Sequence, residues 1–211
     1  PLAPDAVGQA VDVLARAFRD NPLNTAVLES HSPSARQRCN AHGMRAFLPV
    51  ARAHGYTLTA RLGERLTGVL VAAPPSGYPL PPPRAITRLR TILGQGLRAA
   101  RRWGHVFETL KEYHPSDPHW YLATLGVAPD HQGRGIGTAL LGRWLARVDA
   151  DRSASYLETD RSENLPFYER AGFAVVTDAR VFGTPVWLMQ RRARAHPSGA
   201  GDARRASREP D

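Results

Sequence analysis

Residues 120–150 carry the sharpest change of hydrophobic pattern in the chain. The apolar run 122–127 is too short for a helix and is followed by Pro129-Asp130, a pair that favours a turn. From Gly137 onward, apolar residues recur every three or four positions, which is typical of one face of a helix that ends near Asp149. The pattern therefore predicts a strand, a glycine-rich turn and an amphipathic helix.

The rest of the chain alternates helical periodicity with short runs of β-forming residues. Gly63-Glu64 separates two such runs and is typical of a hairpin turn. Alternating strands and helices, with hairpins toward both ends, predict an α/β fold whose sheet is mixed in direction. We expect further helices over residues 5–20, 33–54 and 165–171, and further strands over residues 56–60, 67–73, 154–159, 173–177 and 186–190.

Residues 74–118 are far longer than a hairpin connection needs. Proline and glycine exclude regular structure over residues 76–83, and apolar residues then repeat at helical spacing from Ile86 to Leu110. We expect one or two helices, broken at Gly104 because glycine inside a helix costs about 1 kcal/mol. Their apolar face is interpreted as core. Because long insertions in compact domains are usually functional, this helical insert is also a candidate wall of a binding site.

Composition and charge indicate how many domains the chain has and which functions are not expected. The 211 residues suit one domain, placed at residues 1–192, and the basic tail 193–211 has no large apolar residue and is predicted to be disordered. Most of the net charge of +9 lies in residues 84–112 and 191–211. Two separate basic patches, one of them in the tail, are interpreted as solvated surface, so nucleic-acid binding is not expected.

Neither metal binding nor membrane insertion is indicated. Cys39 is the only cysteine, which excludes an internal disulfide and a cysteine-based metal site. No spacing of histidines and acids argues for a metal. No run approaches the roughly 18 apolar residues of a membrane span, and the first residues lack the pattern of an export signal. We therefore expect a cytoplasmic protein without a metal.

The glycines between the predicted strand and helix point to an anionic ligand. Gly133, Gly135 and Gly137 allow positive φ and close approach of the backbone, and the first turn of a helix leaves N–H groups unpaired. Such a helix end binds phosphates. The spacing G-x-G-x-G fits neither the P-loop, which needs a Lys, nor the dinucleotide pattern G-x-G-x-x-G. The alternative is a glycine-rich turn without a ligand.

Two motifs resemble one enzyme family. Gln132-Gly-Arg-Gly-Ile-Gly137 resembles the Q/R-x-x-G-x-G/A acyl-CoA motif of the GNAT acetyltransferases, and 164–173, Asn-Leu-Pro-Phe-Tyr-Glu-Arg-Ala-Gly-Phe, resembles a loosened form of the second signature of that family. Within the family, residues 117–190 are most similar to the puromycin N-acetyltransferases. The resemblance implies a GNAT-type, mostly antiparallel sheet, with strands splayed at the acetyl-CoA site. The family usually begins with a strand, for which only residues 1–4 are available here.

The resemblance also implies a donor site for acetyl-CoA. The pyrophosphate of CoA would lie on the N–H groups from Gln132 to Thr138, and the pantetheine would pair with the exposed edge of the central strand. Gly126 would ease a bulge there. Arg134 would add charge or simply face solvent. The predicted donor-binding residues are Leu125, Val127, Gln132, Gly133, Arg134, Gly135, Gly137, Thr138 and Asn164.

Two residues are candidates for acid and base catalysis. Tyr168 matches the general acid of the family, which would protonate the departing thiolate. The alternative is a tyrosine that packs a helix onto the sheet. For the general base we favour Glu158, which could instead orient a Tyr or Arg. His119, His114 or a water relay are the other candidates for the base.

The acceptor is expected to be the amine of a small molecule, an antibiotic or a natural-product intermediate, as the resemblance implies. Alternative functions are acetylation of a protein N-terminus or lysine, and acyl-CoA binding without catalysis. Neither the identity of the amine nor the oligomeric state follows from the sequence. Trp103, Phe107, His114 and Trp120 are predicted to border the acceptor pocket, and Arg84, Arg88, Arg98 and Arg102 to face solvent.

Overall fold

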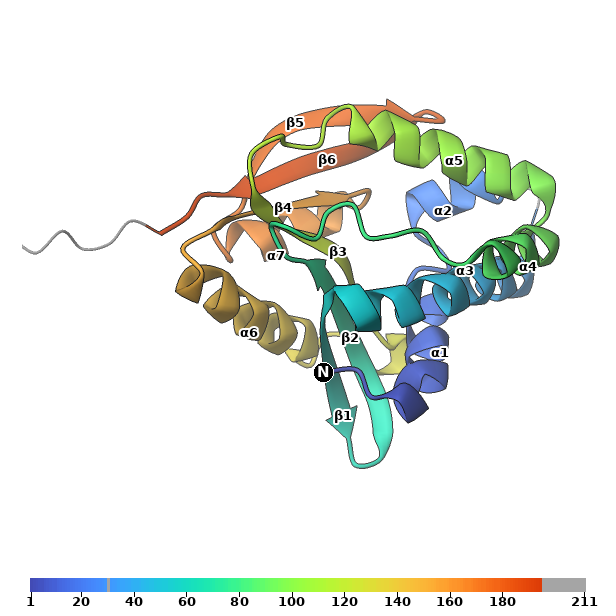
Figure 1. The fold of residues 1–211 in the computed structure, drawn as a ribbon, viewed down its shortest axis with the longest axis horizontal. Helices are drawn as coiled ribbons and strands as arrows, with labels where there is room; N and C mark the ends of the chain where they lie inside the picture. Colours follow the sequence, from blue (N-terminus) through green and yellow to red (C-terminus); the bar gives the residue numbers. More distant parts are fainter. Residues whose placement is uncertain (30, 195–211) are drawn as a thin grey trace, which may run out of the picture.

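A six-stranded sheet organises the computed structural model, which describes residues 1–29 and 31–194 (Figure 1). The strand order is β1-β2-β3-β4-β6-β5. Every neighbouring pair is antiparallel except β3 and β4, which are parallel. The predicted mixed, mostly antiparallel sheet is therefore confirmed. The strands are β1 (Tyr56–Leu62), β2 (Arg65–Ala73), β3 (His119–Val127), β4 (Ala154–Thr159), β5 (Ala174–Val181) and β6 (Thr184–Arg191).

Helices cover both faces of the sheet (Figure 1). On one face α1 and α3 pack against β1 to β3, and on the other face α6 and α7 bury an apolar core. The segment between β2 and β3 supplies α4, which packs on α3, and α5, which reaches β5. The helices are α1 (Val7–Ala17), α2 (Pro22–Val27), α3 (Pro33–His54), α4 (Ala85–Gln95), α5 (Leu97–Lys111), α6 (Ile136–Ala150) and α7 (Leu165–Glu169), with 3-10 turns at Pro4–Ala6, Pro129–His131 and Ser162–Asn164.

The strand, turn and helix predicted over residues 120–150 are confirmed as β3, a glycine-rich turn and α6. The large apolar residues from Leu140 to Val148 in α6 are buried, and Trp144 and Val148 are fully buried. Burying side chains of this size stabilises the fold by roughly 1.5–3 kcal/mol each. Hydrophobic burial therefore fixes α6 against β1, β2 and β3, and with it the position of the turn.

The chain begins with two helices where we predicted one. The predicted helix 5–20 ends at Ala17, and a second short helix, α2, starts at Pro22. Proline is favoured at the first position of a helix because it has no N–H to leave unpaired there, so Pro22 starts α2. Within residues 1–29 there is no strand before α1. Instead, the Leu2 N–H donates to the Thr57 hydroxyl at 2.9 Å, which ties the first residues to β1.

The helical insert differs from the prediction in two respects. The break lies at Gly96, whose φ of +87° favours glycine, whereas Gly104 lies inside α5, where an added Cβ would meet no atom within 4 Å. The predicted burial of its apolar face is also wrong for α4, which has no buried residue. The apolar side chains left exposed are Ile86, Leu89, Leu93, Leu97 and Phe107.

The predicted tail, from residue 195 onward, lies outside the described residues. In the described part of the chain, no helix combines the length and the apolar character that crossing a membrane requires. The same residues bring no three potential metal ligands together in one group.

Candidate active site

The central strands separate at one end of the sheet. β3 and β4 pair over only three positions, His119 to Tyr121 on β3 and Ala154 to Tyr156 on β4. Beyond them β4 continues along β6 to Thr159, and β3 continues along β2 to Val127. Residues 122–127 therefore have a strand neighbour on one side only. We call this divergence of β3 and β4 the opening.

The glycine-rich turn lies directly after the open part of β3. Gly133 and Gly135 have φ values of +73° and +78°, which side chains with a Cβ rarely adopt. The Gln132 side chain donates to the carbonyl of Val127 at 3.0 Å and so holds the turn against the strand end. Gly135 precedes α6, whose first turn receives no side-chain cap and contains no acid. Unpaired N–H groups and the helix dipole therefore favour an anion at this end of α6.

Gly126 has a role other than the one predicted. The bulge in β3 lies at Ala123, because Val71 pairs with Thr124 and Ala72 with Leu122. A Cβ on Gly126 would lie 2.6 Å from the Leu14 side chain of α1. Glycine at this position therefore lets α1 approach the strand.

The remaining predicted donor residues surround the opening and the turn. Leu125 and Val127 are half-buried on the unpaired part of β3. Gly137, in the first turn of α6, would bring a Cβ into ordinary contact with Val127. Arg134 and Thr138 are exposed. The structure thus gathers the predicted phosphate-binding and pantetheine-binding residues at one end of the sheet.

Tyr168 and Asn164 lie at α7, beyond the end of β4. The Tyr168 ring packs edge-on against Phe167 and Phe173, and the residue is 8% exposed. Burial raises the pKa of the Tyr168 phenol above its ordinary value, and the charge of Asp160 adds to this. The phenol therefore keeps its proton at neutral pH. Asn164 donates to the Thr159 hydroxyl at 3.4 Å and does not cap α7 through its side chain.

Glu158 lies at the opening, two residues beyond the last pair between β3 and β4. The Tyr121 hydroxyl donates to its Oε2 at 2.7 Å, and His114 Nδ1 lies 3.9 Å from its Oε1. Burial raises the pKa of Tyr121 well above its usual value, and the neighbouring Glu158 carboxylate raises it further. Tyr121 is therefore a hydrogen-bond donor that orients the carboxylate of Glu158.

Aromatic side chains surround Glu158 on the same face of the sheet. Tyr78 stacks on His114 with 3.6 Å between ring centroids and meets Tyr121 edge-on. His114 also meets Tyr156 edge-on. Leu110 of α5 packs against the buried cluster of Tyr156, Ala179 and Leu188 on this face. We call the group the acceptor-side cluster; it consists of Tyr78, His114, His119, Tyr121, Tyr156 and Glu158.

Of the four residues predicted to border the acceptor, only His114 belongs to this cluster. Trp120 is 3% exposed and lies on the opposite face of β3, where it packs on Trp144 and donates from its indole to Asp151 at 3.1 Å. Phe107 is 65% exposed and stacks on Trp103, 5.8 Å between centroids. Trp120 is thus a core residue, and Phe107 lies on the outer surface of α5.

Sequence reasoning missed Tyr78, Tyr121 and Tyr156. The period of two along strands could have found Tyr121 and Tyr156, because both share a face with Glu158 once β3 and β4 are paired. Tyr78 lies in an irregular segment without such a signal. The exposure of Arg84, Arg88 and Arg98 is confirmed. That of Arg102 is wrong: its guanidinium lies 3.9 Å above the Phe182 ring and donates to the Ala26 carbonyl.

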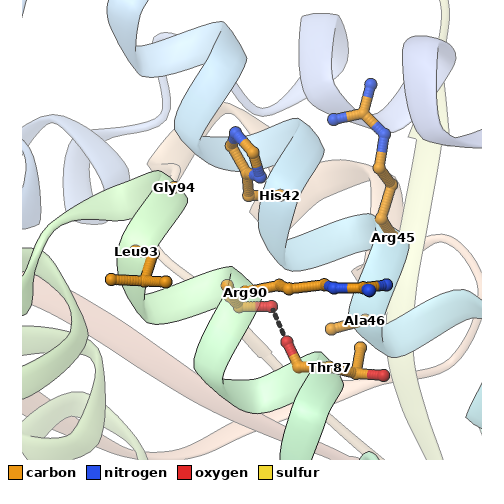
Figure 2. Close-up of a pocket in the computed structure, with 8 residues that line it drawn as sticks. His42, Arg45, Ala46, Thr87, Arg90, Leu93 and Gly94 are labelled. Atoms are coloured by element: carbon orange, nitrogen blue, oxygen red, sulfur yellow. Dashed lines mark hydrogen bonds between the residues drawn. The ribbon is translucent and has the colours of Figure 1, made fainter.

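Two surface grooves lie away from the opening. The larger lies between α3 and α4, and Figure 2 shows the His42 ring beside Gly94, with Arg45 and Arg90 along the groove. A Cβ on Gly94 would collide with the His42 ring, so glycine here allows the helices to approach. The other groove lies between α1 and the β1–β2 hairpin. Neither groove is lined by a residue of the turn or of the acceptor-side cluster.

Comparison with known proteins gives the same fold and domain type. Three solved structures share the fold. One is described as histone acetyltransferase HPA2 and related acetyltransferase, from Corynebacterium glutamicum, with 24% identity, coverage of 93% of this chain and 96% of that one, and a TM-score of 0.68. The ribosomal-protein-S18-alanine N-acetyltransferase of Escherichia coli has 13% identity, coverage of 95% and 96%, and a TM-score of 0.55. A PaiA N-acetyltransferase from Thermoplasma acidophilum, in complex with coenzyme A, has 14% identity, coverage of 89% and 93%, and a TM-score of 0.53.

A family model, described as an acetyltransferase (GNAT) domain, matches residues 99–175. The matched stretch runs from α5 through β3, the glycine-rich turn, α6, β4 and α7, and so contains the opening and both candidate catalytic residues. The finer similarity to the puromycin N-acetyltransferases stays a prediction. Residues 99–175 therefore match an acetyltransferase (GNAT) domain, and the described chain has the fold of solved acetyltransferases.

Proposed function

We propose that the chain transfers the acetyl group of acetyl-CoA directly to the amine of a small molecule, an antibiotic or a natural-product intermediate. The observation that carries the proposal is the position of Glu158 at the opening, oriented by Tyr121 and enclosed by the aromatic rings of the acceptor-side cluster. A carboxylate among aromatic rings suits a cationic amine, because both attract a positive charge.

The donor is proposed to lie along the open edge of β3. Its pyrophosphate would meet the N–H groups from Gln132 to Thr138, and its pantetheine would pair with the backbone near Leu125 and Val127. This proposal is supported by the uncapped start of α6 and by the three-residue limit of the β3–β4 pairing. Asn164, at the start of α7, would contact the donor from the side of β4.

Acid and base are assigned to Tyr168 and Glu158. Glu158 would accept a proton from the ammonium form of the acceptor, so that the free amine can attack the thioester carbon. Tyr168 would donate a proton to the thiolate when the carbon–sulfur bond breaks. The raised pKa of Tyr168 supports this role, because the phenol is protonated before each reaction.

A small acceptor is favoured over a peptide by the irregular segment between β2 and α4. Its Tyr78 stacks on His114 and meets Tyr121, so this segment covers the cluster next to Glu158. A peptide substrate would need an open groove at that point. The same face is covered further along by α5, through Leu110.

The test is release of CoA thiol from acetyl-CoA in the presence of amines. The panel would contain puromycin and other amine antibiotics, polyamines, amino acids, and peptides with either a free N-terminus or a lysine. We expect turnover with one or more small amines and little with the peptides. If the protein acetylates a peptide faster than any small amine, the acceptor is a protein and this proposal is wrong. Donor binding without turnover on any amine would replace it by acyl-CoA binding alone.

A further inference from the structure

The two histidines of the acceptor-side cluster have defined tautomers. His119 Nδ1 lies 2.7 Å from the carbonyl oxygen of Asp117, which only accepts, so His119 carries its proton on Nδ1. Burial lowers the pKa of His119, which keeps the ring neutral and leaves a lone pair on Nε2. His114 Nε2 lies 3.0 Å from that nitrogen and must therefore donate to it. A neutral His114 then has a lone pair on Nδ1.

The lone pair of His114 Nδ1 is an unused proton site. Nδ1 is buried, has no hydrogen-bond partner among the described residues, and lies 3.9 Å from Glu158 Oε1. While the ring is neutral, its lone pair faces a carboxylate. Once Nδ1 binds a proton, an imidazolium faces the carboxylate and the two attract each other. Binding of one proton at His114 Nδ1 therefore turns the contact with Glu158 from unfavourable to favourable.

The groups that face His114 allow it to hold this charge. They are Tyr78 from the segment after β2, His119 and Tyr121 from β3, and Tyr156 and Glu158 from β4. Glu158 is the only acid among them, and none is a lysine or arginine. The imidazolium would thus have one counter-ion and no fixed positive neighbour.

Acetylation of a primary amine that binds as its ammonium ion removes two protons from nitrogen. The ammonium nitrogen loses one proton before it attacks, and a second after the carbon–nitrogen bond has formed and the carbon–sulfur bond has broken. Tyr168 supplies the proton that the thiolate takes up. Of the two protons that leave nitrogen, one finally restores Tyr168 and the other passes to solvent. One carboxylate cannot hold both at the same time.

We propose that His114 is the second proton acceptor, taking the first proton from Glu158 onto Nδ1 so that Glu158 is ionised again for the second. This inference rests on the proposed function. Because His114 acts through Glu158 and does not touch the amine, it is a positioning residue that also stores a proton. His119 fixes its tautomer, so that the lone pair of His114 faces Glu158.

The first test is His114→Gln, in which the amide nitrogen can still donate to His119 but no proton can be stored. We expect kcat to fall by about tenfold to a hundredfold, with the KM for acetyl-CoA unchanged. His105→Gln, an exposed histidine on α5, is the matched control and should match the wild type.

A double-mutant cycle gives a second criterion. If His114 acts through Glu158, then His114→Gln should add little loss in a Glu158→Gln background, whereas multiplying losses would show independent roles and contradict the proposal.

The tautomer can be measured without any reaction. Nitrogen NMR of the wild-type protein should show His114 protonated on Nε2 with a bare Nδ1, and a proton on Nδ1 in the neutral ring would refute the inference even if His114→Gln failed to fold. Absence of turnover by the wild type with every amine, alongside the expected tautomer, would count against the proposed function only. Turnover by the wild type with unaltered kinetics in His114→Gln would count against this inference only.

Discussion

The two halves of the proposed site are built in opposite ways. On the donor side, residues 119–150 run from β3 through the turn into α6 without a gap, and Trp144 and Val148 are fully buried. On the acceptor side, the segment between β2 and β3 supplies Tyr78 and His114 from irregular stretches, and its first helix has no buried residue. The donor half is held by local sequence and core packing, whereas the acceptor half depends on contacts between distant segments.

This difference suggests a division of roles. A rigid turn with two positive-φ glycines suits a ligand part that is always the same, such as a pyrophosphate. A wall assembled from a long connection suits a part that differs between related enzymes, because connections tolerate changes of length and sequence. The predictions below test this division, from the largest expected effect to the smallest.

The largest effect is expected for Tyr168→Phe. Loss of the proton donor should lower kcat by about a hundredfold or more and leave acetyl-CoA affinity nearly unchanged. Because burial raises the pKa of Tyr168, wild-type kcat should not fall through loss of this proton until the pH exceeds about 10. Tyr113→Phe, at an exposed tyrosine, is the control. If kcat of Tyr168→Phe stays within a factor of two of the wild type, the residue only packs α7.

Trp120→Leu and Phe107→Leu compare a core position with a surface position. Trp120 loses buried contacts and the hydrogen bond to Asp151, so the free energy of unfolding should fall by about 2 kcal/mol. Phe107→Leu should change it by less than about 0.5 kcal/mol. Urea unfolding measures both. If Trp120→Leu keeps its stability but changes the order of preference among amine acceptors, Trp120 is part of the acceptor site.

Gly135→Val tests the donor turn. The positive φ disfavours a β-branched side chain by at least about 1–2 kcal/mol, so acetyl-CoA affinity should fall by about tenfold or more as the turn shifts. Calorimetry of CoA binding measures the change. Gly142→Ala lies on the exposed side of the same helix without a positive φ and should bind normally. If Gly135→Val binds CoA normally, the turn is not part of the donor site.

The smallest effect is expected for truncation after Arg192. The residues removed contain no large apolar side chain, so kcat and thermal stability should stay within error of the full chain. The one described ion pair that is lost joins exposed Arg194 to Asp149, and such pairs contribute little. A drop in activity at unchanged stability would show that the tail contacts the substrate.

The sequence predicts the strand, turn and helix of the proposed donor half well, because the signals for these elements are local. The apolar period of α6, the turn glycines and the short run of β3 each act within a few residues, and the predicted helix 33–54 coincides with α3. The hairpin at Gly63-Glu64 is confirmed for the same reason.

The acceptor half could not be predicted in the same way. The stack of Tyr78 on His114 joins residues 36 positions apart, and no period in the sequence relates them. The partial burial of Arg102 depends on Phe182 from the β5–β6 turn, and the exposure of α4 depends on how it meets α3. The free-energy cost of glycine inside a helix led us to predict the helix break at Gly104. In the structure the break is at Gly96.

The central claim is that acetyl-CoA binds at the opening with its phosphates on the glycine-rich turn. Amide hydrogen exchange, with and without CoA, tests it most directly, because the method reports on each backbone N–H that the ligand would engage. The account predicts slower exchange at Leu125 to Val127 and at Gly133 to Thr138, and unchanged exchange in the α3–α4 groove of Figure 2. Slower exchange in that groove, with none at the turn or at β3, would contradict it.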